Sequence, residues 1–171
     1  MAVKENALFV VPAQAVQGHD RAPVRIPSAT LSKIRHSAKA GTRSRSRESF
    51  LESADALLEQ ALAARASQDL ATALEYAYQA GLRTAGARIA SSPVIAARKR
   101  LPSGAWEQLA LVGAESAAWA EKLGSFSRIR SRVASGIEPH VPVDVLDELI
   151  ALVQDFNAQT VGGEGHTAAA A

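Results

Sequence analysis

The chain of 171 residues contains no cysteine, few aromatic residues and no long apolar run. The missing cysteines exclude a disulfide framework, a thiol nucleophile and cysteine-ligated zinc. No stretch approaches the roughly 18 consecutive apolar residues of a membrane-spanning helix, so we expect no membrane partner. Aromatic residues make up only 5% of the chain, and β-branched residues are thinly scattered, which disfavours β-strands.

The N-terminus also lacks the pattern of a secretory signal. Lys4 is followed directly by Glu5, and the apolar run 7–11 stops at Pro12. Such signals use an apolar core of roughly 7–15 residues, which this run does not reach. We therefore expect a cytoplasmic protein.

Alanine is abundant instead, at 36 of the 171 positions. Alanine has the lowest cost of all residues in a helix, and no strand-like alternation competes with the helical periodicity. The composition therefore predicts an all-α fold.

The small net charge of +2 conceals two regions of opposite sign. Residues 1–47 hold nine basic and two acidic side chains, whereas residues 48–171 hold ten basic and fifteen acidic ones. Prolines interrupt every candidate element near the N-terminus, so we expect residues 1–46 to be a disordered basic arm. This arm either tracks a phosphate backbone or an acidic partner, or is a solubilising tail. Residues 161–171 have little to bury and are expected to be a disordered C-terminal tail.

Between these tails, periods of three and four residues predict four to five helices in an up-and-down bundle, because short connectors favour antiparallel neighbours. A capping pattern at Ser49 predicts the first start, and Asp69 suits the N-terminus of the second helix. Trp106 and Trp119 are expected to anchor the core, and a stripe of small residues is expected to serve close helix packing. The expected ranges are 49–67, 69–90, 103–113, 114–135 and 143–160.

Catalytic and metal-binding patterns are missing from this framework. The glycines of 161–165 lack a following helix and a Lys-Ser/Thr pair, so they form no phosphate loop. The four histidines are widely separated, and no pair has a metal-ligand spacing on a helix. We therefore predict no metal, no cofactor and no catalytic residue.

Two cationic clusters remain as candidate sites. Arg98, Lys99 and Arg100 are consecutive in a loop, and Arg128, Arg130 and Arg132 precede His140. Residues 128 and 132 share a helix face, whereas Arg130 points elsewhere, toward the apolar side. An arginine facing a bundle needs an anion or a carboxylate partner. Either the arginines pair with glutamates of neighbouring helices, or these seven residues form a phosphate-binding surface.

The order of segments resembles a small actinobacterial branch of the HEPN superfamily over residues 48–160. The resemblance rests on the basic stretch 97–109, which leads into Trp106 and Glu107, and on the later Ala-Trp of 115–120. It implies that residues 47–160 form a HEPN-like helical bundle, with a homodimer expected. It also implies RNA or a nucleotide as a partner, or an antitoxin-like protein, since active superfamily members are metal-independent ribonucleases of toxin–antitoxin and defence systems.

Active members of that superfamily carry an arginine, four to six intervening residues and a histidine on one helix. No histidine here has this spacing, and the nearest pair, Arg132 and His140, is separated by seven residues that include Gly136 and Pro139. The resemblance therefore implies a non-catalytic module that binds a nucleotide or RNA. A ribonuclease toxin with a site displaced to Arg132 and His140, and a purely structural dimerisation bundle, are the alternatives.

Overall fold

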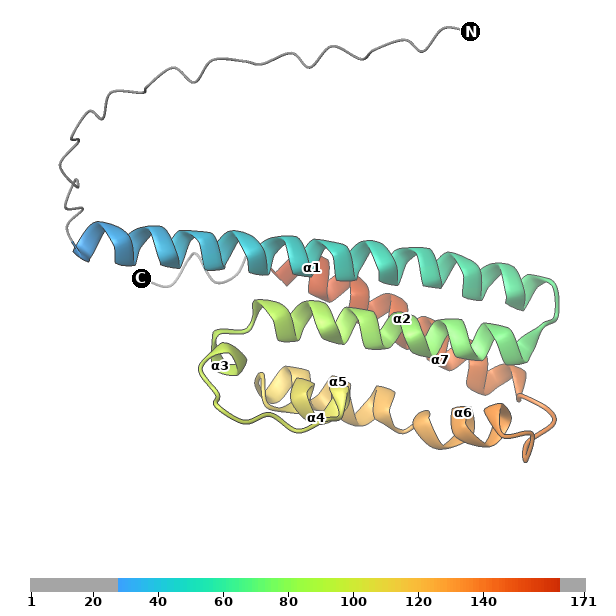
Figure 1. Cartoon of the computed structure of the whole chain (residues 1–171). Helices are drawn as coiled ribbons and strands as arrows, with labels where there is room; N and C mark the ends of the chain where they lie inside the picture. Colours follow the sequence, from blue (N-terminus) through green and yellow to red (C-terminus); the bar gives the residue numbers. More distant parts are fainter. Residues whose placement is uncertain (1–27, 164–171) are drawn as a thin grey trace, which may run out of the picture.

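The computed structural model describes residues 28–163, with side chains from Ser46 onward, and this part of the chain is helical without any strand (Figure 1). The predicted all-α helical bundle is confirmed. Short additional helices raise the number above the expected four to five. The seven helices of the described residues are α1 (Ser28–Ala66), α2 (Leu70–Ser91), α3 (Pro93–Ala96), α4 (Ala105–Ala110), α5 (Ala114–Gly124), α6 (Ser127–Ala134) and α7 (Val143–Gly162).

The helices α5 and α6 run antiparallel to α2. Glu115 in the first turn of α5 contacts Arg88 near the end of α2, at 3.1 Å. Arg130 of α6 contacts Glu75 near the beginning of α2, at 2.7 Å. Helix α2 returns alongside α1 after a three-residue turn. Helix α1, helix α2 and the successive helices α5 and α6 are therefore the first three antiparallel segments of an up-and-down bundle.

The last helix, α7, completes the bundle and runs parallel to α2. Its first turns lie beside the end of α1, where Asp147 accepts a hydrogen bond of 2.8 Å from Nε of Arg65. Its last turn lies beside the end of α2, where Thr160 accepts one of 2.8 Å from Nε of Arg88. Figure 1 shows α7 passing behind α1 and α2.

The first helix begins much earlier than its capping pattern predicts. It starts at Ser28, directly after Pro27, rather than at Ser49. Residues 28–46 are therefore helical, where the sequence led us to expect a disordered arm. This segment is free of proline but has no apolar stripe, so its periodicity gave no sign of a helix. The rest of the expected arm, 1–27, and the tail from 164 onward lie outside the described residues.

A tight turn connects α1 to α2. Gln68 adopts a positive φ of 63°, and the backbone N–H of Asp69 donates to the carbonyl oxygen of Ala64 at 2.9 Å. This pattern closes the C-terminus of α1 in the manner usually given to glycine. The Asp69 carboxylate then accepts from the backbone N–H of Thr72 at 3.2 Å and caps α2, which confirms the predicted helix start.

The core lies where α1, α2, α5 and α7 meet. The predicted apolar stripe of α7 is buried throughout, from Leu146 to Phe156. Trp119 is buried against Phe156 with a ring-centroid distance of 5.1 Å, which confirms its role as an anchor. The largest side chains that are almost fully buried are Phe156, Leu74, Leu109, Leu123, Leu146, Leu149, Val153 and Thr84.

The stripe of small residues on α2 serves close packing, as predicted. A Cβ atom at Gly81 would lie 3.3 Å from Cγ2 of Val153 and 3.5 Å from Cη2 of Trp106. Trp106 is only half-buried and stands edge-on to Tyr78, at 5.8 Å between ring centroids. It is therefore the outer wall of the core rather than its centre.

The segment expected to be one helix over 114–135 is divided. Helix α5 ends at Gly124 and α6 begins at Ser127, with Phe126 buried at the junction. Glycine weakens a helix interior, and here the break allows the chain to bury Phe126 while turning α6 along α2. After α6 ends at Ala134, Gly136 adopts a left-handed φ of 71°, a conformation that glycine accepts without strain.

None of the helices within residues 28–163 combines the length and the apolar character needed to cross a bilayer. The cytoplasmic location stays a prediction.

Candidate functional site

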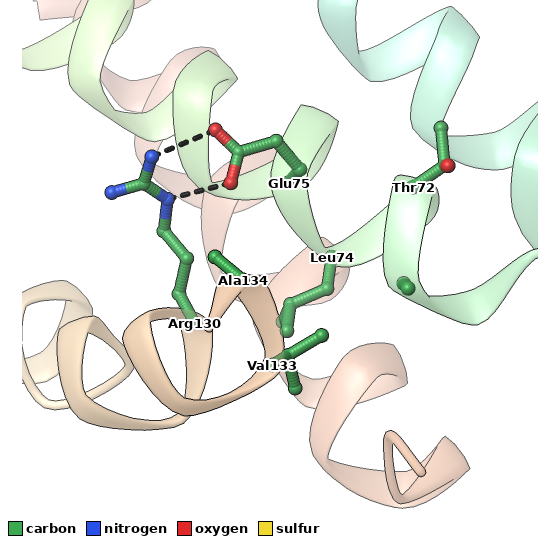
Figure 2. A pocket seen from close by; sticks show the side chains of 7 residues that line it. Thr72, Leu74, Glu75, Arg130, Val133 and Ala134 are labelled. Carbon is green, nitrogen blue, oxygen red and sulfur yellow. Dashed lines mark hydrogen bonds and ion pairs between the residues drawn. The ribbon is translucent and has the colours of Figure 1, made fainter. Parts of the chain in front are cut away.

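Of the predicted arginines, Arg130 lies closest to the centre of the bundle, and it has a carboxylate partner. Its Nε and Nη2 donate to the two oxygens of Glu75 at 2.7 and 2.8 Å (Figure 2). Gln79, one turn further along α2, donates to Oε1 of Glu75 at 2.7 Å. This is the planar two-oxygen geometry that makes arginine–carboxylate pairs specific. The ion pair therefore joins α6 to α2.

A polar network supports this ion pair from the side of the core. The Arg130 guanidinium lies 4.9 Å from the centroid of the Tyr78 ring. The Tyr78 hydroxyl accepts a hydrogen bond of 2.7 Å from Nε1 of Trp106 and shares another of 2.7 Å with Ser127. The network thus connects α2, α4 and α6 through a buried tyrosine.

The Arg130–Glu75 ion pair shifts the pKa values of both partners. The hydrogen bonds from Arg130 lower the pKa of the Glu75 carboxyl below its ordinary value of 4.5, although partial burial opposes this change. The hydrogen bonds to Glu75 raise the pKa of Arg130. Both groups are therefore charged over the whole neutral range.

Two small surface pockets flank Arg130. One of about 400 Å³ is lined by Thr72, Leu74, Val133 and their neighbours, and Figure 2 shows Arg130 and Glu75 at its edge. The other, of about 420 Å³, is lined by Gln79, Leu82, Arg83 and Arg130. Because Glu75 occupies the Nε–Nη2 edge of Arg130 and neutralises its charge, an anion in either pocket would have to compete with a well-formed ion pair.

Arg132 and His140 do not converge with Arg130. Arg132 donates to Glu138 at 3.4 Å, on the surface. His140 is exposed and lines a separate pocket of about 300 Å³ with residues 68–71 of the turn between α1 and α2. None of the predicted arginines lines that pocket. The displaced arginine–histidine site considered from the sequence stays a prediction, since Arg132 is paired with Glu138 and does not line the pocket of His140.

The remaining predicted cations are exposed. Arg98, Lys99 and Arg100 lie in the connector between α3 and α4, and Arg128 lies on the outer face of α6. Within the described residues, none of these four side chains has a carboxylate partner. They differ in this from Arg130 and Arg132, and they are available to a ligand.

A further arginine site was missed by the sequence analysis. Arg88 of α2 donates from Nε to Thr160, and from both Nη1 and Nη2 to a single oxygen of Glu115, each at 3.1 Å. Arg47 of α1 donates from Nη2 to the carbonyl oxygen of the same Thr160 at 2.6 Å. These residues line a pocket of about 640 Å³. No spacing in the sequence could reveal this pocket, because five different helices supply its residues.

Among the side chains of residues 46–163, no group of three or more His, Asp or Glu is arranged to hold a metal ion. The hydroxyl and carboxylate groups of the sites above are all engaged in hydrogen bonds to neighbouring side chains or lie at the surface. The candidate chemistry of this protein is therefore the recognition of anions by guanidinium groups.

Comparison with known proteins gives one family. A family model described as SAV_6107-like HEPN matches residues 63–161, from the last turn of α1 to the last turn of α7. The match thus covers more than half of the chain and all of the elements that carry the arginine sites except Arg47. No curated protein and no solved structure matches the chain.

Proposed function

Because the chain belongs to the SAV_6107-like HEPN family, we propose that it is a non-catalytic module that binds phosphate groups of RNA or nucleotides through exposed cations. The observation that carries this proposal is the run Arg98, Lys99 and Arg100, three exposed cations without a carboxylate partner among the described residues. Arg128 adds a fourth such cation on α6.

The charge distribution supports a polyanionic ligand. Residues 48–171 are net acidic, so this region as a whole does not attract phosphate. Attraction for a polyanion is therefore confined to the cations that have no carboxylate partner. Binding confined to one loop and one helix is weak and strongly dependent on salt, because each neutralised phosphate releases its counterions. The basic segment that precedes the bundle adds attraction of the same sign.

The arrangement of the same residues supports a module without cleavage activity. The ribonuclease alternative needs His140 within hydrogen-bond reach of a phosphate that Arg132 holds. His140 lines a pocket without any of the predicted arginines, and Arg132 is paired with Glu138. These contacts support binding over the ribonuclease alternative. The homodimer and the antitoxin-like partner stay predictions.

The test is the binding of a fluorescent single-stranded RNA to the full chain, followed by anisotropy. We expect saturable binding at low salt, and a loss of about tenfold or more when Arg98, Lys99, Arg100 and Arg128 are all replaced by Gln, since phosphate contacts add up along the strand. The matched control is Arg65→Gln, which also removes a positive charge but at a side chain held by Asp147. An equal loss of affinity per removed charge in the control would show that RNA binding depends only on the net charge of the protein.

A further inference from the structure

We propose that the 640 Å³ pocket between the ends of α2 and α7 and the beginning of α5 binds the oxyanion of a small amphipathic molecule, with Arg88 as its principal donor. This site is separate from the proposed RNA contacts, because none of the exposed cations 98–100 and 128 lines it. This proposal therefore goes beyond the proposed RNA binding, and either proposal can fail without the other.

Arg88 is held in a fixed position at the base of the pocket. Its side chain is only 14% exposed, and its guanidinium lies 5.1 Å from the centroid of the buried Phe156 ring. Nε is engaged by Thr160 at 2.8 Å. The side chain is thus oriented before any ligand arrives, and its two terminal nitrogens, of which Nη1 also lies 3.4 Å from Oγ of Ser116, form the edge that faces Glu115.

The group on that edge is easily displaced. Glu115 is 71% exposed, and only one of its oxygens accepts from Arg88, from Nη1 and Nη2 together. The Arg130–Glu75 pair, by contrast, uses two oxygens and two donors. Because the Glu115 carboxylate is solvated on the surface, leaving Arg88 costs it little, and a ligand oxyanion can take its place.

The rest of the pocket indicates what the anion is attached to. Arg47 lines the same pocket and donates to the carbonyl oxygen of Thr160. The lining also includes the apolar side chains of Pro93, Val94 and Val112. A volume of about 640 Å³ lies within the range of small-molecule sites and exceeds the needs of an inorganic ion. The ligand is therefore an organic phosphate or carboxylate with an apolar body.

The experiment measures binding of phenyl phosphate, benzoate and inorganic phosphate to the full chain by calorimetry. We expect phenyl phosphate or benzoate to bind more tightly than inorganic phosphate, because only they reach the apolar wall. Glu115→Gln should tighten binding about two- to fivefold, since it removes a competing exposed carboxylate. Arg88→Gln should weaken it about tenfold or more, as expected for a lost charged hydrogen bond. The matched control, Arg83→Gln, lies on the same helix but outside this pocket and should retain binding.

Arg88→Gln has a structural risk, because Arg88 also holds Thr160 and packs on Phe156. Arg88→Lys keeps the positive charge but loses the paired terminal nitrogens of the guanidinium. A thermal melt of each variant identifies those that fold. Glu115→Gln provides an answer that does not depend on Arg88 variants, since a purely structural ion pair predicts lower stability and unchanged binding. Unchanged affinity in Glu115→Gln, or no saturable binding of either organic anion at millimolar concentration, would overturn the proposal. Replacing residues 98–100 and 128 by Gln should abolish RNA binding and leave phenyl phosphate binding intact, which separates the two sites.

Discussion

Arg130 of α6 and Glu75 of α2 form an ion pair in which two guanidinium nitrogens meet two carboxylate oxygens at 2.7 and 2.8 Å. The sequence left two roles open for this arginine, a partner of a glutamate on a neighbouring helix or part of a phosphate surface. The observed geometry corresponds to the first. The side chain thus contributes to the packing of α6, and the proposed ligand contacts are assigned to cations that have no such partner.

The first prediction concerns the strength of this pair. Glu75→Gln keeps the shape of the side chain but removes its charge, and should lower the free energy of unfolding by about 1 kcal/mol, since both partners are about one-third exposed. Urea denaturation measures the change. Arg132→Gln, which breaks the longer and more exposed contact to Glu138, should change stability by less than half of that amount. Equal effects would contradict the distinction between the two pairs.

The second prediction follows from the lowered pKa of Glu75. A carboxyl whose pKa is lower in the folded state stabilises the protein above its unfolded pKa, near 4.5, and this contribution disappears as the pH falls through the folded value. The stability of the wild type should therefore decrease between about pH 5 and the acid range, and Glu75→Gln should reduce this slope. Asp147, whose pKa is lowered by Arg65, provides a second, smaller part of the slope that Asp147→Asn removes. A slope unaffected by Glu75→Gln would contradict the assignment.

The third prediction tests the hydroxyl behind the ion pair. Tyr78 is buried, and its hydroxyl accepts from Trp106 and contacts Ser127. Tyr78→Phe leaves the Trp106 N–H without its partner and should cost about 1–3 kcal/mol in thermal or chemical denaturation. Tyr76→Phe is the matched control, because no hydrogen bond of the Tyr76 hydroxyl is found within residues 46–163, and it should be nearly neutral.

A structural feature can be predicted from the sequence when the residues that form it lie close together in one helix. The stripe from Leu146 to Phe156 and the Asp69 cap were predictable, because each depends on residues three or four positions apart in one helix. The helical start at Ser28 was not, since residues 28–46 have no apolar face to indicate a period. The partner of Arg130 was left open because Glu75 lies 55 residues away on another helix.

The site around Arg88 was missed for the same reason. Its contacts to Glu115 and Thr160 cross between helices, and Arg47 lies before Ser49, where the sequence predicts the start of the first helix. Only the antiparallel order of the helices places these residues together. Sequence periodicity predicts the faces of individual helices, whereas sites shared between helices depend on the register of their packing.

The fourth prediction concerns the turn between α1 and α2. Gln68 has a φ of 63°, in the left-handed region that a residue with a Cβ atom adopts at a cost of about 1 kcal/mol. Gln68→Gly should therefore stabilise the protein by about 0.5–1 kcal/mol, since the glycine gain is partly offset by entropy in the unfolded chain. Gln68→Ala, which keeps the Cβ atom, should bring no such gain. A melting temperature that rises equally in both variants would contradict the backbone explanation.

The central proposal for this protein is that it binds RNA without cleaving it, and one gel experiment tests both the binding and the lack of cleavage. End-labelled single-stranded RNA is incubated with the full chain at low salt, and half of each sample is then denatured to measure the length of the RNA. We predict a slower band in the native gel, which disappears as salt is raised, and full-length RNA in the denatured half. Shortened RNA that depends on His140, tested with His140→Ala, would contradict the claim, as would the absence of any shifted band at low salt.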